Sequence, residues 1–404
     1  MSEELIFDKS LQNIKFIFRL SGLNIDHKKR TFKQNCIYLF NLLWHQTDLL
    51  SALSWVLCGM FTGKVFTELT FVAPCSVFGI LADTKGVLFI LQERKIYGLM
   101  NNLRDLEIKA KDFVGTRRDS LIKPDIYLLD IVIKVLNILN GLMIVVFDMC
   151  PPIFIAIKYF TTGQLELMLP FLDVYFFDGF DLRYWPFLYA HQVWSVCVSL
   201  LEICATDYFF FTCCTHIRIQ FKLLQHQFQD ILTNRRITAD LTNQMPIQAQ
   251  FRELVKWHQG IITSVNTLEE IYSKASLSNF LASSLIICLT GFNVTAAANN
   301  TLVVTFIVFL FMSLLQIFFL CLFGDLLMQS SMDITDAVYN SRWYRSDMVM
   351  QKNMLMVQTR AQNSCKLTAA GFADVNLRAF MKIMSTSWSY FALLQTIYGS
   401  RETR

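Results

Sequence analysis

The feature that most constrains this chain is a series of long, mostly apolar runs. The clearest, Leu302–Phe323, reads LVVTFIVFLFMSLLQIFFLCLF and contains no charged residue. A helix needs about 20 such residues to cross the ~30 Å hydrocarbon layer of a bilayer. Six further runs reach about that length: Cys36–Phe61, Phe71–Leu91, Ile126–Ile157, His191–Thr215, Leu277–Val294 and Phe380–Ile397. We therefore predict an all-α membrane protein with seven transmembrane helices, the last being the weakest by hydropathy.

The composition agrees with a membrane protein. Of the 404 residues, 54% are hydrophobic and 17% are charged, whereas soluble domains carry about 25% charged residues. The net charge of +4 is small and scattered, and because no basic stripe is present we expect no nucleic-acid partner. The opening MSEELIFDKS lacks the basic segment and apolar core of a cleavable signal peptide. Insertion is expected to depend on the internal helices.

Lysine and arginine are distributed unevenly between the two sides of the predicted spans. The segment before the first span and every second loop after it contain 27 of the 36, and the alternate segments contain 5. Basic loops stay in the cytoplasm, so the amino terminus is predicted inside and the carboxyl terminus outside. This orientation argues against a G-protein-coupled receptor. Two sequons, at Asn293 and Asn299, fall around a predicted outer loop, and their glycosylation is left open.

Two inner segments, 216–275 and 329–375, are long enough to form helices below the membrane. In the first, apolar residues recur at three- and four-residue steps on an otherwise polar helix, from Phe251 through Leu254, His258 and Ile261 to Val265. We predict that such helices extend the spans and pack together. The alternative is that both segments are solvated connectors.

No enzyme motif is present: GxGxxG, GxxxxGK[ST], HExxH and GxSxG are all missing from the sequence. We expect no catalytic residues, no metal site and no cofactor. The eleven cysteines are odd in number, lie mostly in apolar runs and form no CxxC. We interpret them as small buried side chains rather than disulfide or zinc ligands.

Charged and hydroxyl groups inside the spans are candidates for function. Asp130 and Lys134 lie four residues apart, which predicts a structural ion pair on one helix face. In the last span, Lys382, Ser385, Ser389 and Thr396 recur at helical spacing, interrupted by an apolar residue. Such a stripe is typical of a pore-lining helix with an apolar constriction. It is equally typical of close helix packing, and the pattern alone does not separate the two.

The outer halves of the second to sixth spans are rich in phenylalanine, methionine, valine and cysteine. A cavity among them would suit a small, mostly neutral molecule. The alternative for any one of these residues is lipid exposure or core packing. The candidate ligand-binding residues are Phe71, Cys75, Phe78, Met143, Val146, Phe147, Val193 and Val196.

Four segments resemble blocks of the insect odorant receptor family, most clearly over the last ~130 residues. The segments are 253–294 (ELVKWHQGIITSVNTLEEIYSKASLSNFLASSLIICLTGFNV), 339–344 (YNSRWY), 367–371 (LTAAG) and 389–394 (SYFALL). Many members have a proline shortly after the Arg-x-Gln before the LTAAG block, whereas Asn363 follows Arg360-Ala-Gln here. The departure concerns only the local turn.

The resemblance implies a subunit of a tetrameric, odorant-gated, non-selective cation channel. It would assemble with a shared co-receptor in the plasma membrane of olfactory sensory neuron dendrites. Odorants would bind within 1–328, subunits would meet at an inner anchor (329–373), and the pore would be lined by 374–404. On that basis Tyr339, Trp343 and Tyr344 are assigned to the anchor and Ser389, Leu393, Thr396 and Ile397 to the pore and gate.

Two alternatives remain from the sequence. A taste-type receptor of the same superfamily usually ends in Thr-Tyr, five residues and Gln-Phe, and that ending is absent. A transporter would be expected to show internal repeats, and none is found. The sequence does not name the odorant.

Overall fold

The computed structural model describes residues 5–25, 30–63, 66–114, 118–171, 179–231, 247–296 and 300–402. Within these ranges the chain is helical, apart from turns and one isolated antiparallel bridge between Thr368 and Asp374. The helices are α1 (Ile6–Ser21), α2 (Phe32–Phe61), α3 (Phe66–Leu91), α4 (Glu93–Val114), α5 (Arg118–Thr162), α6 (Trp185–Asp230), α7 (Ile247–Ala296), α8 (Asn300–Asn340), α9 (Met348–Gln362) and α10 (Leu377–Glu402), with a short 3-10 helix, η3 (Trp343–Arg345).

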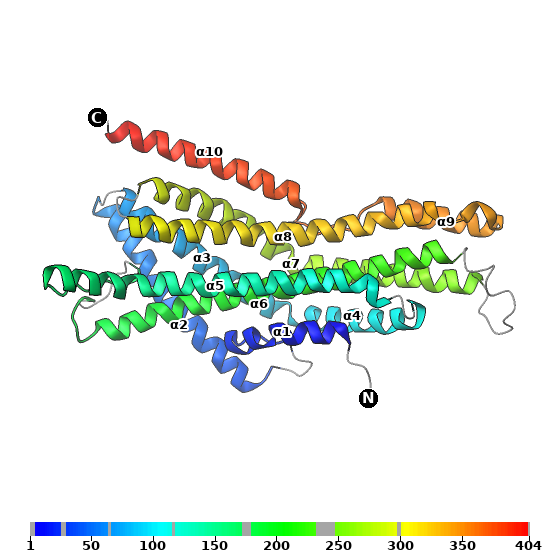
Figure 1. Cartoon of the computed structure of the whole chain (residues 1–404), viewed down its shortest axis with the longest axis horizontal. Coiled ribbons are helices and arrows are strands. Elements are labelled where there is room, and N and C mark those ends of the chain that lie inside the picture. Colours follow the sequence, from blue (N-terminus) through cyan, green and yellow to red (C-terminus); the bar gives the residue numbers. More distant parts are fainter. Residues whose placement is uncertain are drawn as a thin grey trace.

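The seven predicted spans fall within α2, α3, α5, α6, α7, α8 and α10, which confirms the seven-helix membrane fold. Five of these, α3 and α5 to α8, are long and apolar enough to cross a bilayer by length and composition alone, among the described residues. The other two are more polar. α2 carries buried Asn41 and His45, and α10 carries the hydroxyl stripe. Both lie along the other helices of the bundle (Figure 1).

Four helices are far longer than a bilayer is thick. α6 has 46 residues and α7 has 50, and at 1.5 Å per residue each measures about 70 Å. Their excess length joins α4 and α9 at the end of the molecule opposite the carboxyl terminus (Figure 1), which we call the inner end. The predicted stripe on α7 is buried there, so the predicted helical extension is confirmed. α8 continues unbroken through residue 328. The predicted boundary there, between the ligand-binding part (1–328) and the anchor (329–373), stays a prediction.

A carboxylate fixes the start of the chain to the inner end. The backbone N–H groups of Ile6 and Phe7 donate to the two oxygens of Glu107, at 2.8 and 3.0 Å. Arg118 pairs with the same carboxylate at 2.7 Å. A negative group at a helix amino terminus is favourable because it faces unsatisfied N–H groups and the positive end of the helix dipole. The first turn of α1 is thereby held against α4.

Charged groups inside the bundle are paired between distant helices. Lys85 of α3 contacts Asp207 of α6 at 2.7 Å, and both are buried. The predicted pair of Asp130 and Lys134 is wrong: among the described residues, Asp130 instead accepts a hydrogen bond from Asn13 of α1 at 3.2 Å. Their spacing permitted a pair on one helix, but an amide from α1 reaches the carboxylate.

The segment between α9 and α10 is clamped to the long helices. The backbone N–H of Thr368 donates to Glu269 of α7 at 2.6 Å, and its hydroxyl contacts the same carboxylate. The N–H of Ala370 donates to the carbonyl of Ser273 at 3.1 Å. On α8, a Cβ at Gly324 would lie 2.2 Å from the carbonyl oxygen of Val375, so this close approach requires glycine. The turn into α10 therefore has a defined position.

The ten described cysteines are all free, and most are buried or half-buried as expected. Cys36 and Cys58 of α2 are exposed instead, on the outside of the bundle.

Candidate ligand-binding site

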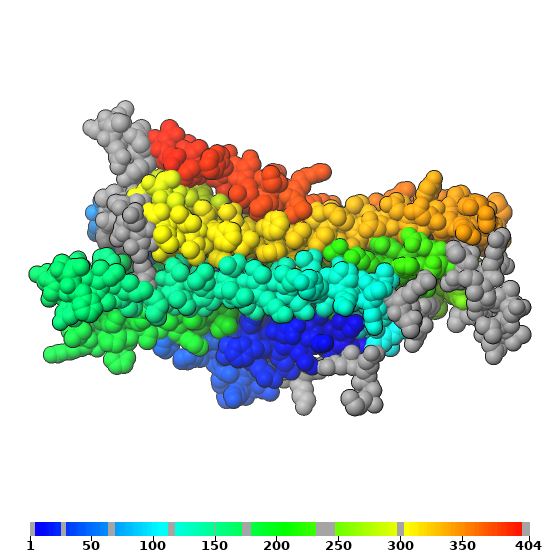
Figure 2. Space-filling view, viewed as in Figure 1, coloured from blue at the N-terminus to red at the C-terminus, as the bar shows by residue number. Residues whose placement is uncertain are grey.

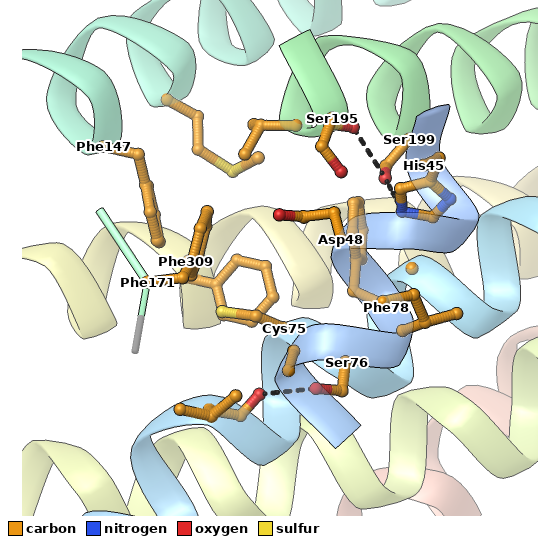
Figure 3. Close-up of a pocket in the computed structure, with 16 residues that line it drawn as sticks. His45, Asp48, Cys75, Ser76, Phe78, Phe147, Phe171, Ser195, Ser199 and Phe309 are labelled. Atoms are coloured by element: carbon orange, nitrogen blue, oxygen red, sulfur yellow. Dashed lines mark hydrogen bonds between the residues drawn. The ribbon is translucent and has the colours of Figure 1, made fainter. Parts of the chain in front are cut away.

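A cavity lies in the outer half of the bundle, enclosed by α2, α3, α5, α6 and α8 (Figure 3). The space is about 620 Å³, counting the part that opens outward to solvent. The lining residues are His45, Asp48, Leu49, Ala52, Val72, Cys75, Ser76, Phe78, Gly79, Met143, Phe147, Phe171, Ser195, Val196, Ser199 and Phe309.

One wall of the cavity is aromatic and centred on Phe309 of α8. Its ring meets Phe78 of α3 edge-on at 5.6 Å between centroids and Phe147 of α5 at 5.8 Å. Phe147 in turn stacks on Phe171 at 6.3 Å. Edge-to-face pairs of this kind are favourable beyond the apolar area they bury. The wall provides rigid contact area for an apolar molecule.

The opposite side of the cavity is polar. His45 of α2 contacts Asp83 of α3 through Nδ1 at 2.9 Å and the hydroxyl of Ser199 of α6 through Nε2 at 2.8 Å. Ser199 also donates to the carbonyl of Ser195 at 3.1 Å. The amide of Gln46 donates to the second oxygen of Asp83. This network connects three helices through buried polar side chains.

Five of the eight predicted ligand-binding residues line this cavity, and three do not. Cys75, Phe78, Met143, Phe147 and Val196 are in the lining. Phe71 instead packs on Phe306 at 5.3 Å between ring centroids. Val146 and Val193 are half-buried elsewhere on their helices. Binding by the five stays a prediction.

Sequence reasoning missed the polar side of the cavity. His45, Asp48, Ser195 and Ser199 lie inside predicted spans, where polar residues are unusual, and that signal could have identified them. Asp148 and Glu202, to which the sequence assigned no role, are both buried outside this lining. Their carboxyl oxygens accept no hydrogen bond within the described part of the chain.

A second cavity adjoins the first. It is lined by residues of α5, α6 and α8 and extends to Asp207, Tyr208 and Gln316. Phe78, Met143 and Phe309 line both cavities. These three side chains therefore lie where the two cavities meet.

The predicted pore residues lie on α10, which runs along the edge of the bundle against α7 and α8 (Figures 1 and 2). The inward face of α10 includes buried Ser387, whose hydroxyl donates to the carbonyl of Ser284 at 3.3 Å. The predicted residues Ser389, Leu393, Thr396 and Ile397 are all exposed. Both hydroxyls are bonded within α10, to the carbonyls of Ser385 and Ala392. This face points away from the rest of the chain.

The predicted anchor residues are also exposed. Tyr339 lies near the end of α8, and Trp343 and Tyr344 form η3 just after it. The rings of Trp343 and Tyr344 meet edge-on at 6.3 Å, and the guanidinium of Arg345 lies over Tyr344 at 5.6 Å. An exposed aromatic cluster of this kind is typical of protein interfaces.

Comparison with known proteins places the chain among chemosensory proteins. Residues 65–388 match the family model described as 7tm Odorant receptor. The chain is 27% identical to putative odorant receptor 92a of Drosophila melanogaster over 349 residues, covering 82% of this chain and 79% of that protein. Drosophila melanogaster odorant receptor 67c is 25% identical over 348 residues, with 81% and 80% covered.

A solved structure has the same fold. It is the insect olfactory receptor OR5 from Machilis hrabei in complex with eugenol, with a TM-score of 0.82 and 19% sequence identity. The match covers 97% of this chain and 99% of that one.

Proposed function

Because the chain belongs to the 7tm odorant receptor family, we propose that it is the odorant-binding subunit of a ligand-gated, non-selective cation channel. It acts with a shared co-receptor, as part of a heterotetramer, in the plasma membrane of olfactory sensory neuron dendrites. Its ligand is a small, mostly neutral volatile. The observation that carries this proposal is an apolar cavity enclosed by five helices in the outer half of a seven-helix membrane protein.

The chemistry of the cavity favours that ligand class. Phenylalanine, methionine, valine and leucine side chains dominate its lining, and such walls bind apolar surface because it leaves water. Burying a charged group of the ligand in such a cavity, without an opposite charge or hydrogen-bond partner, costs several kcal/mol. The related Machilis hrabei receptor was solved in complex with eugenol, a precedent for a small aromatic ligand in this fold.

One helix, α8, contributes to the cavity wall and also contacts the predicted pore helix. Phe309 in the cavity wall belongs to α8, and Phe318 lies further along the same helix. Phe318 meets Phe380 of α10 edge-on at 5.5 Å. A ligand that binds more tightly when α8 and α10 are in the open arrangement shifts the population toward it. The exposed face of α10, with Leu393 and Ile397, lines the pore.

Assembly with the co-receptor depends on the exposed aromatic cluster at the inner end. Tyr339, Trp343 and Tyr344 provide large, rigid side chains that remain 65%, 36% and 60% exposed. Aromatic residues of this kind often dominate the binding energy of an interface. On this proposal they are covered by a neighbouring subunit.

The test is recording from cells that express this chain with and without the co-receptor, over a panel of volatiles. We expect odorant-evoked cation current only when both chains are present. Val196→Phe should then reduce the response because the larger side chain fills the cavity. Val193→Phe is the matched control: it lies on the same helix, is similarly half-buried and does not line the cavity.

Two results would overturn the proposal. One is substrate accumulation without any conductance, which would indicate a transporter. The other is an equal loss of response in the two valine variants at equal surface expression, which would place the ligand elsewhere.

A further inference from the structure

We propose that the ligands of this cavity carry a hydrogen-bond donor, an O–H or N–H group, that binds the carboxylate of Asp48. This inference rests on the proposed function and narrows its ligand class. Asp48 is the one carboxylate among the described lining residues. Figure 3 shows its side chain directed into the cavity, away from the imidazole of His45.

The carboxylate of Asp48 has no hydrogen-bond donor within the described part of the chain. Its side chain is 14% exposed, and its Oδ1 is shielded from solvent. Nδ1 of His191 on α6 lies 3.6 Å from Oδ1, beyond hydrogen-bond distance. A buried carboxylate without a partner is costly. The position therefore favours a molecule that supplies the missing donor.

The hydrogen bonds around His191 determine whether its Nδ1 is a donor or an acceptor. The hydroxyl of Thr47 donates to the carbonyl of Trp44 at 2.7 Å, so its single proton is already used. Nε2 of His191 lies 2.9 Å from that hydroxyl oxygen and donates to it when the Thr47 proton is directed to the carbonyl of Trp44. In the neutral imidazole Nδ1 is then an acceptor. In that tautomer two acceptors, one on Asp48 and one on His191, face each other at 3.6 Å with no hydrogen between them.

Most other polar side chains of the cavity are already committed, the hydroxyl of Ser195 and the thiol of Cys75 excepted. His45 contacts Asp83 and Ser199 through its two ring nitrogens. Ser199 donates to the carbonyl of Ser195 and Ser76 to that of Val72. The committed groups offer little to a ligand whose only polar atom is an acceptor, such as an ether. A ligand donor, by contrast, finds the free acceptor of Asp48.

The ligand class is thus alcohols, phenols and amines, which share a donor at one end of an apolar body. Hydrogen bonds to a charged acceptor are about twice as strong as those between neutral groups. A protonated amine adds charge pairing to the same contact. A variant that removes the charge at position 48 distinguishes alcohol ligands from protonated amine ligands.

The experiment measures binding of matched probe pairs to the purified complex with the co-receptor, as thermal stabilisation against ligand concentration. The pairs are benzyl alcohol with benzyl methyl ether, 1-octanol with octyl methyl ether, and benzylamine with toluene. In the wild-type complex each donor should bind about tenfold or more tightly than its partner, the loss typical for a hydrogen bond to a charged group.

Two variants at the same position test the role of the carboxylate. Asp48→Leu should abolish the preference in every pair. Asp48→Asn retains an acceptor oxygen without the charge, so it should weaken the amine preference most and the alcohol preference less. Ser76→Ala is the control within the lining, because its hydroxyl is already bonded to Val72; it should shift the two members of a pair equally.

Three results would overturn the inference: donors that bind no better than their partners, a preference that persists in Asp48→Leu, or no stabilisation by any alcohol or amine. The first is also expected if a protonated His191 already pairs with Asp48. The readout requires no current. A complex that prefers donors through Asp48 but never conducts would overturn the proposed channel and leave the ligand class standing.

Discussion

Replacing Glu269 with Gln is expected to loosen the turn that leads into α10. The carboxylate of Glu269 holds both the backbone N–H of Thr368, at 2.6 Å, and its hydroxyl. Each hydrogen bond to a charged group contributes about 1.5–3 kcal/mol. A glutamine keeps one neutral acceptor and turns an N–H₂ group toward a donor. We expect the docked turn to lose about 2–3 kcal/mol, with the seven spans unchanged.

Hydrogen exchange followed by mass spectrometry reads this local opening directly. The amides of Thr368 and Ala370 donate to Glu269 and Ser273, so a peptide covering 366–375 reports on the clamp. A loss of about 2–3 kcal/mol makes exchange about 30- to 150-fold faster, at a factor of ten per 1.4 kcal/mol.

The neighbouring residue provides the control. Glu270 pairs with Lys95 at 2.8 Å, but the two side chains are 60% and 46% exposed. Exposed ion pairs contribute about 0–1 kcal/mol, so Glu270→Gln should leave exchange of the turn nearly unchanged. The reasoning fails if both variants exchange at the wild-type rate, or if Glu270→Gln opens the turn as much as Glu269→Gln.

Four further predictions follow from the pore, the anchor, a buried histidine and the topology. Leu393→Ser should raise ligand-free current because a polar side chain holds water in an apolar neck, with a smaller effect from Leu394→Ser on the half-buried side of α10; unchanged basal current at normal surface expression would contradict this. Trp343→Ala should reduce co-purification with the co-receptor and shrink the currents; unaltered assembly would remove Trp343 from the interface. Burial, with a smaller contribution from Arg360, lowers the pKa of His258 from 6.5 to about 4. The unfolded chain therefore binds this proton first, and stability should fall as the pH drops from 6.5 toward 4, by at most about 1.4 kcal/mol per pH unit; thermal unfolding of wild type and His258→Gln across that range checks it, and equal slopes would refute it. Epitope tags should be accessible on intact cells at the carboxyl terminus and only after permeabilisation at the amino terminus; the reverse would refute the predicted orientation.

The membrane architecture could be read from the sequence because hydropathy is a local property. An apolar run such as Leu302–Phe323 specifies a spanning helix whatever it packs against, since every backbone polar group must be satisfied within the helix. The three- and four-residue spacing on α7 likewise predicted a buried face that the structure contains. The motif blocks added the family, which the comparison over residues 65–388 then established.

The cavity was only partly predictable, because which residues line it depends on how neighbouring helices are rotated and shifted. Met143 and Phe147 line it, while Val146 on the same helix does not. All three are apolar, so hydropathy does not distinguish a residue facing a cavity from one facing a neighbouring helix. Phe71 shows the same limit, since its ring packs on Phe306 of α8.

What the sequence alone determined, then, is the set of helices, their membrane spans and the family to which the chain belongs. Only the tertiary structure decided which polar groups meet. Asp130 accepts from Asn13, 117 residues away, and Lys85 pairs with Asp207, 122 residues away. Asp48 faces the cavity without a donor. Spacing along one helix constrains contacts within that helix, whereas the partner of a buried charge is set by the packing of helices that are remote in the chain.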